Sequence, residues 1–417
     1  MSIINDDLLI RAIKREGKII DLKIRHLEDG GVNYAGKIFF VNFVLNTQET
    51  CNEIHNLVIK LPDYDSFFGS LNKQFKCVQK EIFIYTRLSA DIVNFQQKMF
   101  ELLHLELPLP EVIYGDEVDE VLILENLSVS GYLMKDRVLG HSYNECVCVV
   151  ESLALFHGLN WAYMKSFDSE SEYILKHPYV LGDWWKLSEQ YLTREDYIFS
   201  KQNTFELILH FLETHYPDEK ELFADVKLYL QKTPIPANAR YFYEQCEGFN
   251  VLCHGDTWGN NILIKYDDST PLDGKFIDFQ LTKYCSPAAD LSQYIWSAAN
   301  NEVILNHIPD LLSNYYAKLK SVCVNFDYKF EFIKDQLVEK FKQLNGFQFQ
   351  FQLSSIVHAY APKTNAYKPN VEKSNLFSEE FVDDFFKFAN NNFEKLPKQT
   401  AQRMMCLIRC AKRFNVF

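Results

Sequence analysis

The sequence predicts an α+β protein of two lobes, with an antiparallel β-sheet in the N-lobe and a mainly helical C-lobe. Apolar runs of strand length, rich in β-branched and aromatic residues, concentrate in the first third of the chain. Beyond that third, apolar residues recur mainly at helical spacing. A chain of 417 residues, 47% of them hydrophobic, is long enough to build two cores. We therefore assign residues 1–125 to the N-lobe and residues 126–417 to the C-lobe.

The N-lobe is expected to begin with a short helix and a β-hairpin. Residues 5–16 are amphipathic, and Asp6 and Asp7 suit the positive end of a helix in its first turn. The segments KIFFVNFVL (37–45) and NLVIKL (56–61) have strand composition. Because only a polar stretch separates them, we expect the two strands to pair as a hairpin.

A helix and a further strand complete the predicted N-lobe. In FKCVQKEIFIYTRL (75–88), Val78, Ile82 and Tyr85 recur at helical spacing. The segment EVLILENL (120–127) is an apolar strand that follows the turn-prone sequence YGDEVDE. This strand leads into the C-lobe.

The C-lobe should contain a long buried helix. The segment NECVCVVESLALFHGL (144–159) carries apolar residues along one stripe. His157 lies in that stripe, where a hydrogen-bonded core histidine is expected rather than a ligand. Two aromatic segments, 184–192 and 341–353, are expected to contribute mainly to the core, with lining of a ligand pocket as the alternative.

Charge and hydropathy exclude several classes of partner. The formal net charge is −13, so the chain should repel phosphate backbones and anionic membrane surfaces. We expect no nucleic acid partner and no membrane partner. No signal-peptide pattern begins the sequence, and no apolar run approaches the length of about 20 residues that spans a membrane. A soluble, cytoplasmic protein is expected.

Two polar loops of the C-lobe carry residue types that suit phosphoryl transfer. That reaction needs a carboxylate to orient or deprotonate the attacking hydroxyl, and Mg²⁺ held by oxygen ligands. In HGDTWGNN (254–261), Asp256 and Asn261 have the spacing of the catalytic Asp and the metal-binding Asn of a protein-kinase loop. Asp278 follows in FIDFQ (276–280). The alternative for Asp256 and Asn261 is a polar turn that only stabilises the loop.

Two N-lobe residues complete the pattern. Lys60 ends a predicted strand and Glu81 lies on the helix that follows, which is the order of the Lys-Glu ion pair in kinases. Each residue alone would be a solvated surface charge. Their combination with Asp256 and Asp278 favours the functional interpretation.

These motifs resemble the ecdysteroid kinase-like, or CHK kinase-like, family of the aminoglycoside and choline kinase superfamily. The family pattern is His-Gly-Asp, one residue, Trp and Asn-Asn, followed by a metal motif Asp-Phe-Gln. The resemblance extends over roughly residues 25–385. Supporting segments are GGVNYAGKIFFV, LVIKLP, LILENLSVSGYLMKDR, LALFHGLNWA and SPAADLSQYIW.

The resemblance implies a protein-kinase-like fold and a role for each motif residue. Asp256 would be the catalytic base or the group that orients the hydroxyl. Asn261 and Asp278 would be the Mg²⁺ ligands. Lys60 would bind the phosphates of ATP and would be positioned by Glu81. ATP and Mg²⁺ are therefore the expected cofactors.

The resemblance also assigns the nucleotide contacts of the N-lobe. Asn33 and Gly36 would belong to the phosphate loop, in which relatives usually carry Ser at the place of Gly36. Glu125 and Leu127 would bind the adenine through the backbone of the hinge. Relatives usually have an acidic pair there, whereas this chain has Glu125 and Asn126. These departures affect nucleotide affinity more than the chemistry of the site.

The resemblance implies an ATP-dependent kinase that phosphorylates a hydroxyl group of an ecdysteroid or a related small molecule. The alternatives are a kinase for choline, ethanolamine or xenobiotics, and a catalytically inactive nucleotide-binding relative. His254 is expected to brace the loop, and Trp258 to be a packing anchor, with substrate contact as the alternative. The expected partner is the hydroxylated acceptor, and we expect a monomer or a weak homodimer.

Overall fold

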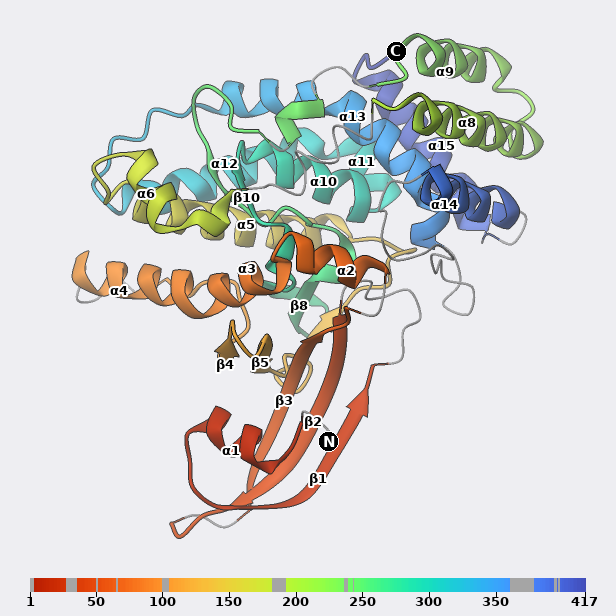
Figure 1. Ribbon diagram of the computed structural model, residues 1–417. Coiled ribbons are helices and arrows are strands. Elements are labelled where there is room, and N and C mark those ends of the chain that lie inside the picture. The colour runs from red at the N-terminus through yellow and green to blue at the C-terminus, as the bar shows by residue number, and fades with distance from the viewer. Residues whose placement is uncertain are drawn as a thin grey trace.

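Two lobes, one dominated by a sheet and one by helices, make up the computed structural model of the chain (Figure 1). This arrangement confirms the predicted fold class. The structure describes residues 4–27, 36–49, 52–64, 67–99, 105–181, 193–235, 239–242, 244–360, 379–393, 396 and 398–417.

A five-stranded antiparallel sheet forms the N-lobe. Its strands lie in the order β1-β2-β3-β5-β4. They are β1 (Lys18–His26), β2 (Gly36–Asn46), β3 (Glu53–Pro62), β4 (Val112–Asp116) and β5 (Val121–Glu125). The predicted hairpin is confirmed as β2 and β3, which pair over their whole lengths from Gly36 opposite Pro62 to Leu45 opposite Glu53.

One face of this sheet packs against helix α1 (Asp6–Ile13). Asn5 caps the helix, because its side chain accepts a hydrogen bond from Leu8 N–H at 2.9 Å. Alternate residues of the central strands point to this face, as the two-residue period of a strand requires. The N-lobe core contains Leu8, Leu9, Val41, Phe43, Leu45, Leu57, Ile59, Val121 and Ile123.

Strand β1 was not predicted from the sequence. It is an edge strand whose side chains are mostly exposed, and its pairing with β2 is interrupted between Ile20 and Lys23. An edge strand of this kind lacks the clean alternation of apolar and polar residues on which the prediction depends. Strand β4 was also missed, because part of it lies in the segment that we interpreted as a turn.

The predicted helix at 75–88 is confirmed, and it continues further than predicted. It begins as α3 (Cys77–Phe83), passes through a π-helical turn at Ile84–Leu88 and ends as α4 (Ser89–Met99). A shorter helix, α2 (Phe67–Gln74), precedes it. The inner face of α3 is buried, so that Glu81 faces the interior.

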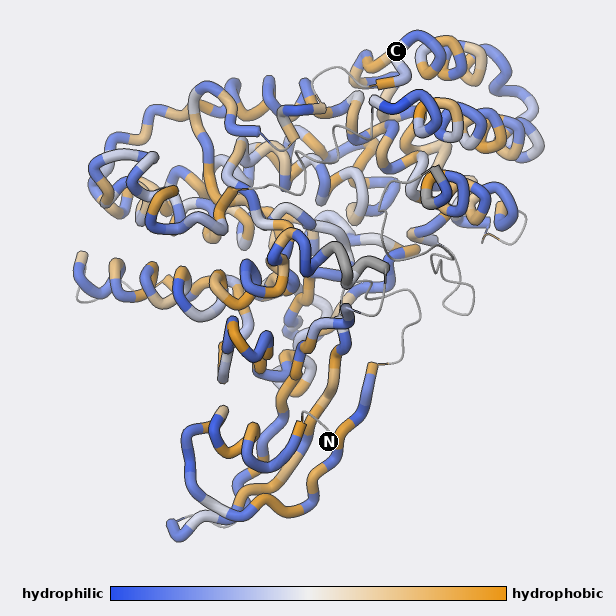
Figure 2. Tube along the Cα trace, in the orientation of Figure 1, coloured by the Kyte–Doolittle hydropathy of each residue, from blue (hydrophilic) through white to orange (hydrophobic). Residues whose placement is uncertain are grey.

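The C-lobe is built around helix α5 (Tyr143–Met164), which is buried on most of its faces. This helix is long and apolar enough to cross a membrane, but 78% of its most apolar window is buried inside the protein. In Figure 2, hydrophobic and hydrophilic residues alternate along the surrounding helices, as expected where one face packs inward. These are α6 (Glu170–Lys176), α8 (Glu195–His215), α9 (Lys220–Lys232), α10 (Ala288–Ala298), α11 (Asn301–Asn306), α12 (Ile308–Val324), α13 (Lys334–Tyr360), α14 (Glu379–Asn392) and α15 (Lys398–Arg413).

Short strands hold the two polar loops of the C-lobe. Strand β7 (Val251–Cys253) precedes the 254–261 loop and pairs with β10 (Lys283–Cys285). Strand β8 (Ile262–Asp267) follows that loop and pairs with β9 (Thr270–Phe276) and with β6 (Tyr132–Met134). Strands β7 and β8 therefore bracket this loop.

Helices α5 and α12 approach closely at Gly158. A Cβ atom at this position would lie 2.7 Å from Val322 Cγ1. Glycine therefore sets the distance between the two helices.

We predict that Gly158→Leu lowers the free energy of unfolding. Overpacking of this kind costs about 1–3 kcal/mol. The higher helix propensity of Leu offsets up to about 1 kcal/mol of this cost. The measurement is urea denaturation of the two proteins. In a Val322→Ala background the same substitution should cost less, and an equal cost in both backgrounds would contradict the assigned contact.

Candidate active site

The 254–261 loop is locked against the loop that follows β9. Gly255 has φ +86°, and a Cβ atom there would lie 2.0 Å from Leu281 O. Only glycine fits both the backbone conformation and this close approach. The two polar loops are thereby held in fixed register.

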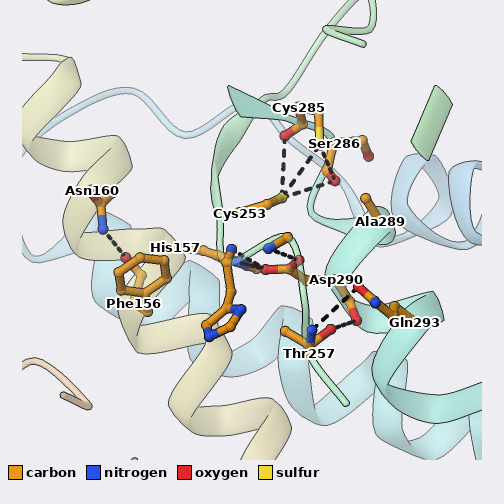
Figure 3. Close-up of polar contacts among 12 residues, drawn as sticks. Phe156, His157, Asn160, Cys253, Thr257, Cys285, Ser286, Ala289, Asp290 and Gln293 are labelled. Atoms are coloured by element: carbon orange, nitrogen blue, oxygen red, sulfur yellow. Dashed lines mark hydrogen bonds and ion pairs between the residues drawn. The ribbon is translucent and has the colours of Figure 1, made fainter. Parts of the chain in front are cut away.

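The backbone of this loop is anchored by Asp290, a fully buried residue of α10 (Figure 3). Its Oδ2 accepts His254 N–H at 2.6 Å, and its Oδ1 accepts Gly255 N–H at 2.9 Å. His157 Nε2 lies 3.1 Å from Asp290 Oδ2, and its Nδ1 lies 2.7 Å from Tyr315 Oη. The expectation that His157 is a hydrogen-bonded core residue is confirmed.

His157, Asp290 and Cys253 lie close enough together to suggest a metal site. The hydrogen bonds of the group account for it without a metal. Both Asp290 oxygens already accept backbone N–H groups, and the Cys253 thiol lies 3.4 Å from Ser286 O as its donor (Figure 3). We assign the cluster to support of the loop.

His254 connects the two polar loops. Its Nδ1 accepts Asp256 N–H at 3.1 Å, and its Nε2 lies 2.8 Å from Ile277 O. The first bond requires an unprotonated Nδ1, so Nε2 carries the hydrogen that it donates to Ile277. Burial lowers the pKa of this imidazole, which favours the same neutral form. The geometry is that of the brace expected for His254.

Both oxygens of Asp256 are engaged. Its Oδ2 accepts Asn261 Nδ2 at 3.0 Å, and its Oδ1 accepts Gln293 Nε2 at 3.2 Å. Burial, together with the negative charge of Asp278, raises the pKa of the Asp256 carboxyl to about 7. Because Asn261 uses its Nδ2 on Asp256, its Oδ1 is the atom that suits a cation.

Lys60 lies between two carboxylates from different elements. Its Nζ is 2.6 Å from Glu81 Oε2 on α3 and 2.7 Å from Asp278 Oδ1 after β9. Burial alone would lower the pKa of Lys60, but the charges of Asp278 and Glu81 outweigh it and raise that pKa. Burial raises the pKa of Glu81 to about 7, although Lys60 opposes the shift. Since Glu81 is only 3% exposed, the alternative of a solvated surface charge is wrong.

The electrostatics of these residues suit a divalent cation. Lys60 pairs with Glu81 and Asp278, and Asp256 adds a third carboxylate nearby. Burial first, and the charge of Asp278 after it, raise the pKa values of Glu81 and Asp256. Asp278 and Asn261 offer carboxylate and amide oxygens, the ligands that Mg²⁺ prefers. Asp278 holds its position with a left-handed backbone, φ 70°, and its Oδ2 accepts Gln280 Nε2 at 3.3 Å. The donor set therefore fits Mg²⁺.

The predicted hinge residues lie where β5 enters the C-lobe. Glu125 N–H donates to Glu111 O at 3.0 Å, and Asn126 N–H donates to Asn56 O at 3.2 Å. In contrast, Leu127 N–H has no hydrogen-bond acceptor among the residues that the structure describes. A buried backbone donor of this kind is normally paired, so Leu127 is the hinge position that suits a ligand.

The structure places one of the two predicted phosphate-loop residues. Gly36 opens β2, and a Cβ atom there would lie 2.8 Å from Leu61 O and 3.8 Å from Lys60 Cε. Glycine therefore lets β2 approach β3 beside Lys60. Asn33 lies outside the described residues.

A mainly apolar cavity of about 370 Å³ adjoins Asp256. Of the aromatic segment 341–353, Phe351 lines this cavity, whereas Phe347 and Phe349 are buried in the core. The aromatic segment 184–192 lies outside the described residues. Residues that line the cavity include Lys135, Asp136, Arg137, Asp256, Trp258, Leu281, Gln293, Trp296, Phe351, Ile356, Tyr360, Phe385, Arg403 and Leu407.

Two residues of the site were not recognised from the sequence. Asp290 and Gln293 were not singled out, although both hold the loop. The available signal was the pair Asp290 and Gln293, three positions apart in a mainly apolar helix. Trp258, expected as a packing anchor with substrate contact as the alternative, lines the cavity, where that alternative stays open.

The sequence profile of the Ecdysteroid kinase-like family matches residues 30–328. No curated protein matches the chain.

Similar solved structures are phosphotransferases with low sequence identity. The GDP and kanamycin complex of APH(2")-IIia has 12% identity and a TM-score of 0.38, and the match covers 93% of this chain and 96% of that chain. Macrolide 2'-phosphotransferase type I has 11% identity and a TM-score of 0.33, with coverage of 86% and 92%. The GDP complex of wild-type aminoglycoside 2'-phosphotransferase-IIIa has 11% identity and a TM-score of 0.35, with coverage of 93% and 100%.

The raised pKa values predict a pH-dependent stability. Glu81 and Asp256 have a higher pKa in the folded chain than in the unfolded chain. At a pH between about 4 and about 7 the folded chain therefore binds more protons, and the free energy of unfolding falls as the pH rises through this range. Because the charge of Asp278 contributes to both shifts, Asp278→Asn should make this loss smaller, by on the order of 1 kcal/mol. The measurement is urea denaturation between pH 5 and pH 8.

The control is Asp268→Asn, which removes an exposed carboxylate that has the same left-handed backbone. It should leave the wild-type dependence unchanged. If the stability of the Asp278→Asn protein depends on pH as that of the wild type does, the charge of Asp278 does not raise the two pKa values as assigned.

Proposed function

The chain belongs to the ecdysteroid kinase-like family and is a small-molecule kinase, and on this premise we propose that it transfers the γ-phosphoryl group of Mg-ATP to a hydroxyl of an ecdysteroid or a related hydroxylated molecule. One observation carries the proposal. Asp256 borders both the apolar cavity and the cluster of charged residues that suits a metal-bound triphosphate.

Asp256 acts on the acceptor. A hydroxyl group in the cavity donates its proton to the Asp256 carboxylate, and its oxygen forms a bond to the γ-phosphorus while the bond to the β-phosphate oxygen breaks. ADP leaves, and the proton stays on Asp256 until solvent removes it. A pKa of about 7 suits this step, because the group is then neither a weak base nor permanently protonated.

The remaining motif residues bind the nucleotide. Lys60 would turn its ammonium to the phosphates while Glu81 holds it. Leu127 N–H would donate to the adenine ring, a role that its lack of a described partner supports. Asn261 and Asp278 would hold Mg²⁺. When bound, this cation would neutralise charge that develops on the β- and γ-phosphates.

The charges of the cavity favour an uncharged, apolar acceptor. A choline-like amine needs acidic and aromatic groups around its cationic nitrogen. Of the described lining residues, Asp136 and Asp256 carry carboxylates, whereas Lys135, Arg137 and Arg403 carry permanent positive charges. Such a lining disfavours choline, ethanolamine and polycationic sugars, and its apolar walls suit a rigid hydrophobic alcohol.

The alternative of an inactive nucleotide-binding relative has less support. The presence of Asp256, Asn261 and Asp278, with Asn261 donating to Asp256 and Asp278 paired with Lys60, supports an active kinase. The acidic surface disfavours nucleic acid, and we propose a cytoplasmic monomer or weak homodimer as the working form.

The test is a panel of acceptors with Mg-ATP. We expect phosphorylated product from ecdysone and none, or far less, from choline, ethanolamine and kanamycin, because the basic side chains of the described lining outnumber its carboxylates. Product is measured as transferred γ-phosphate by mass spectrometry. Preferred phosphorylation of choline or kanamycin would overturn the acceptor class.

The control variant is Asp256→Asn. It should lower turnover by at least about 100-fold while the affinity for Mg-ATP changes little, because the base does not hold the nucleotide. Unchanged turnover would exclude Asp256 as the base.

A further inference from the structure

Helix α10 makes two separate connections to the catalytic loop. Asp290 holds the backbone at His254 and Gly255, as described above. Gln293 lies about one turn further along the same helix, is only 4% exposed and lines the acceptor cavity. Figure 3 shows its side chain directed toward Thr257 and the loop. Gln293 lies outside the sequence motifs, which assign it no role.

The orientation of the Gln293 amide is fixed by its partners. Thr257 N–H lies 3.3 Å from Gln293 Oε1, and a backbone N–H can only donate. The amide oxygen therefore faces Thr257, and the NH₂ group must face Asp256. Its Nε2 lies 3.2 Å from Asp256 Oδ1, an atom that can only accept when the carboxylate is ionised.

We propose that Gln293 is the positioning residue for the catalytic carboxylate, holding Asp256 Oδ1 at the wall of the acceptor cavity. This inference rests on the proposed function. Asn261 holds the other oxygen, Oδ2, at 3.0 Å. With one amide on each oxygen, the carboxylate is fixed in both rotation and tilt.

The two amides have different duties. Asn261 is also a proposed metal ligand, so its contact with Asp256 is exposed to changes when Mg²⁺ and nucleotide bind and leave. Gln293 is not a proposed metal ligand, and its other partner is the backbone N–H of Thr257 in the loop itself. A carboxylate oxygen has two lone pairs, so Oδ1 can accept from Gln293 and from the acceptor hydroxyl together.

The test is Gln293→Met, which keeps the length of the side chain and removes the amide. The kcat for ecdysone should fall by about 10- to 100-fold, because misplacement of a catalytic group has costs of this size. The KM for Mg-ATP should stay unchanged. A variant with wild-type kcat would overturn the inference.

The matched control is Gln348→Met. Gln348 is a fully buried glutamine of α13 that donates to Ser292 on α10 at 3.2 Å, outside the cavity. The substitution removes an amide of the same size, which supports the same helix but makes no contact with the catalytic loop. If Gln348→Met lowers kcat as much as Gln293→Met does, support of α10 explains the effect and the inference is wrong.

A second readout needs no acceptor. In a crystal structure of the Gln293→Met protein, the Asp256 carboxylate should leave its wild-type position or occupy several positions, while the Asp290 bonds to the loop persist. An unchanged carboxylate would contradict the inference. This readout separates the two proposals, because a wild-type protein without activity on ecdysone would contradict only the proposed acceptor.

Discussion

The site depends on the pairing of one partly buried ammonium with two carboxylates. Lys60 joins β3, α3 and the loop after β9 through its contacts with Glu81 and Asp278, and so connects the two lobes. Glu81 is buried and the side chains of Lys60 and Asp278 are partly buried, and a charge withdrawn from water is stable only when it is paired. Burial, together with the negative charge of Asp278, raises the pKa values of Glu81 and Asp256 to about 7. The protein thus maintains a negative centre that a divalent cation and a triphosphate would complete.

Rigidity in the surrounding structure makes this centre useful for chemistry. The catalytic loop has no hydrophobic core of its own, and it is held by polar contacts to a fully buried carboxylate, to His254 and to the neighbouring loop. Buried networks of this kind fix one geometry when every member is satisfied. The acceptor side is different, because its cavity is formed by mainly apolar side chains from several helices. Fixed polar groups beside an apolar cavity suit a reaction on a hydrophobic alcohol.

The sequence predicted the features that depend on local spacing. Asp256 and Asn261 lie in one short loop, so their contact follows from the motif. Lys60 and Asp278 are 218 positions apart, and only the resemblance to a family brought them together before the structure did. Strand β1 escaped prediction because an exposed edge strand lacks alternation. Gln293 escaped because its partner belongs to a loop 37 positions earlier, and the polar pair that it forms with Asp290 on α10 does not by itself identify that partner.

The central claim is that Asn261 and Asp278 converge on a metal-bound triphosphate that also contacts Lys60. The most direct measurement is a crystal structure with Mg²⁺ and a non-hydrolysable ATP analogue. We expect Mg²⁺ on the Asn261 and Asp278 oxygens, the phosphates on Lys60, and the adenine at Leu127. A nucleotide bound elsewhere, or a cation held by other residues, would contradict the account.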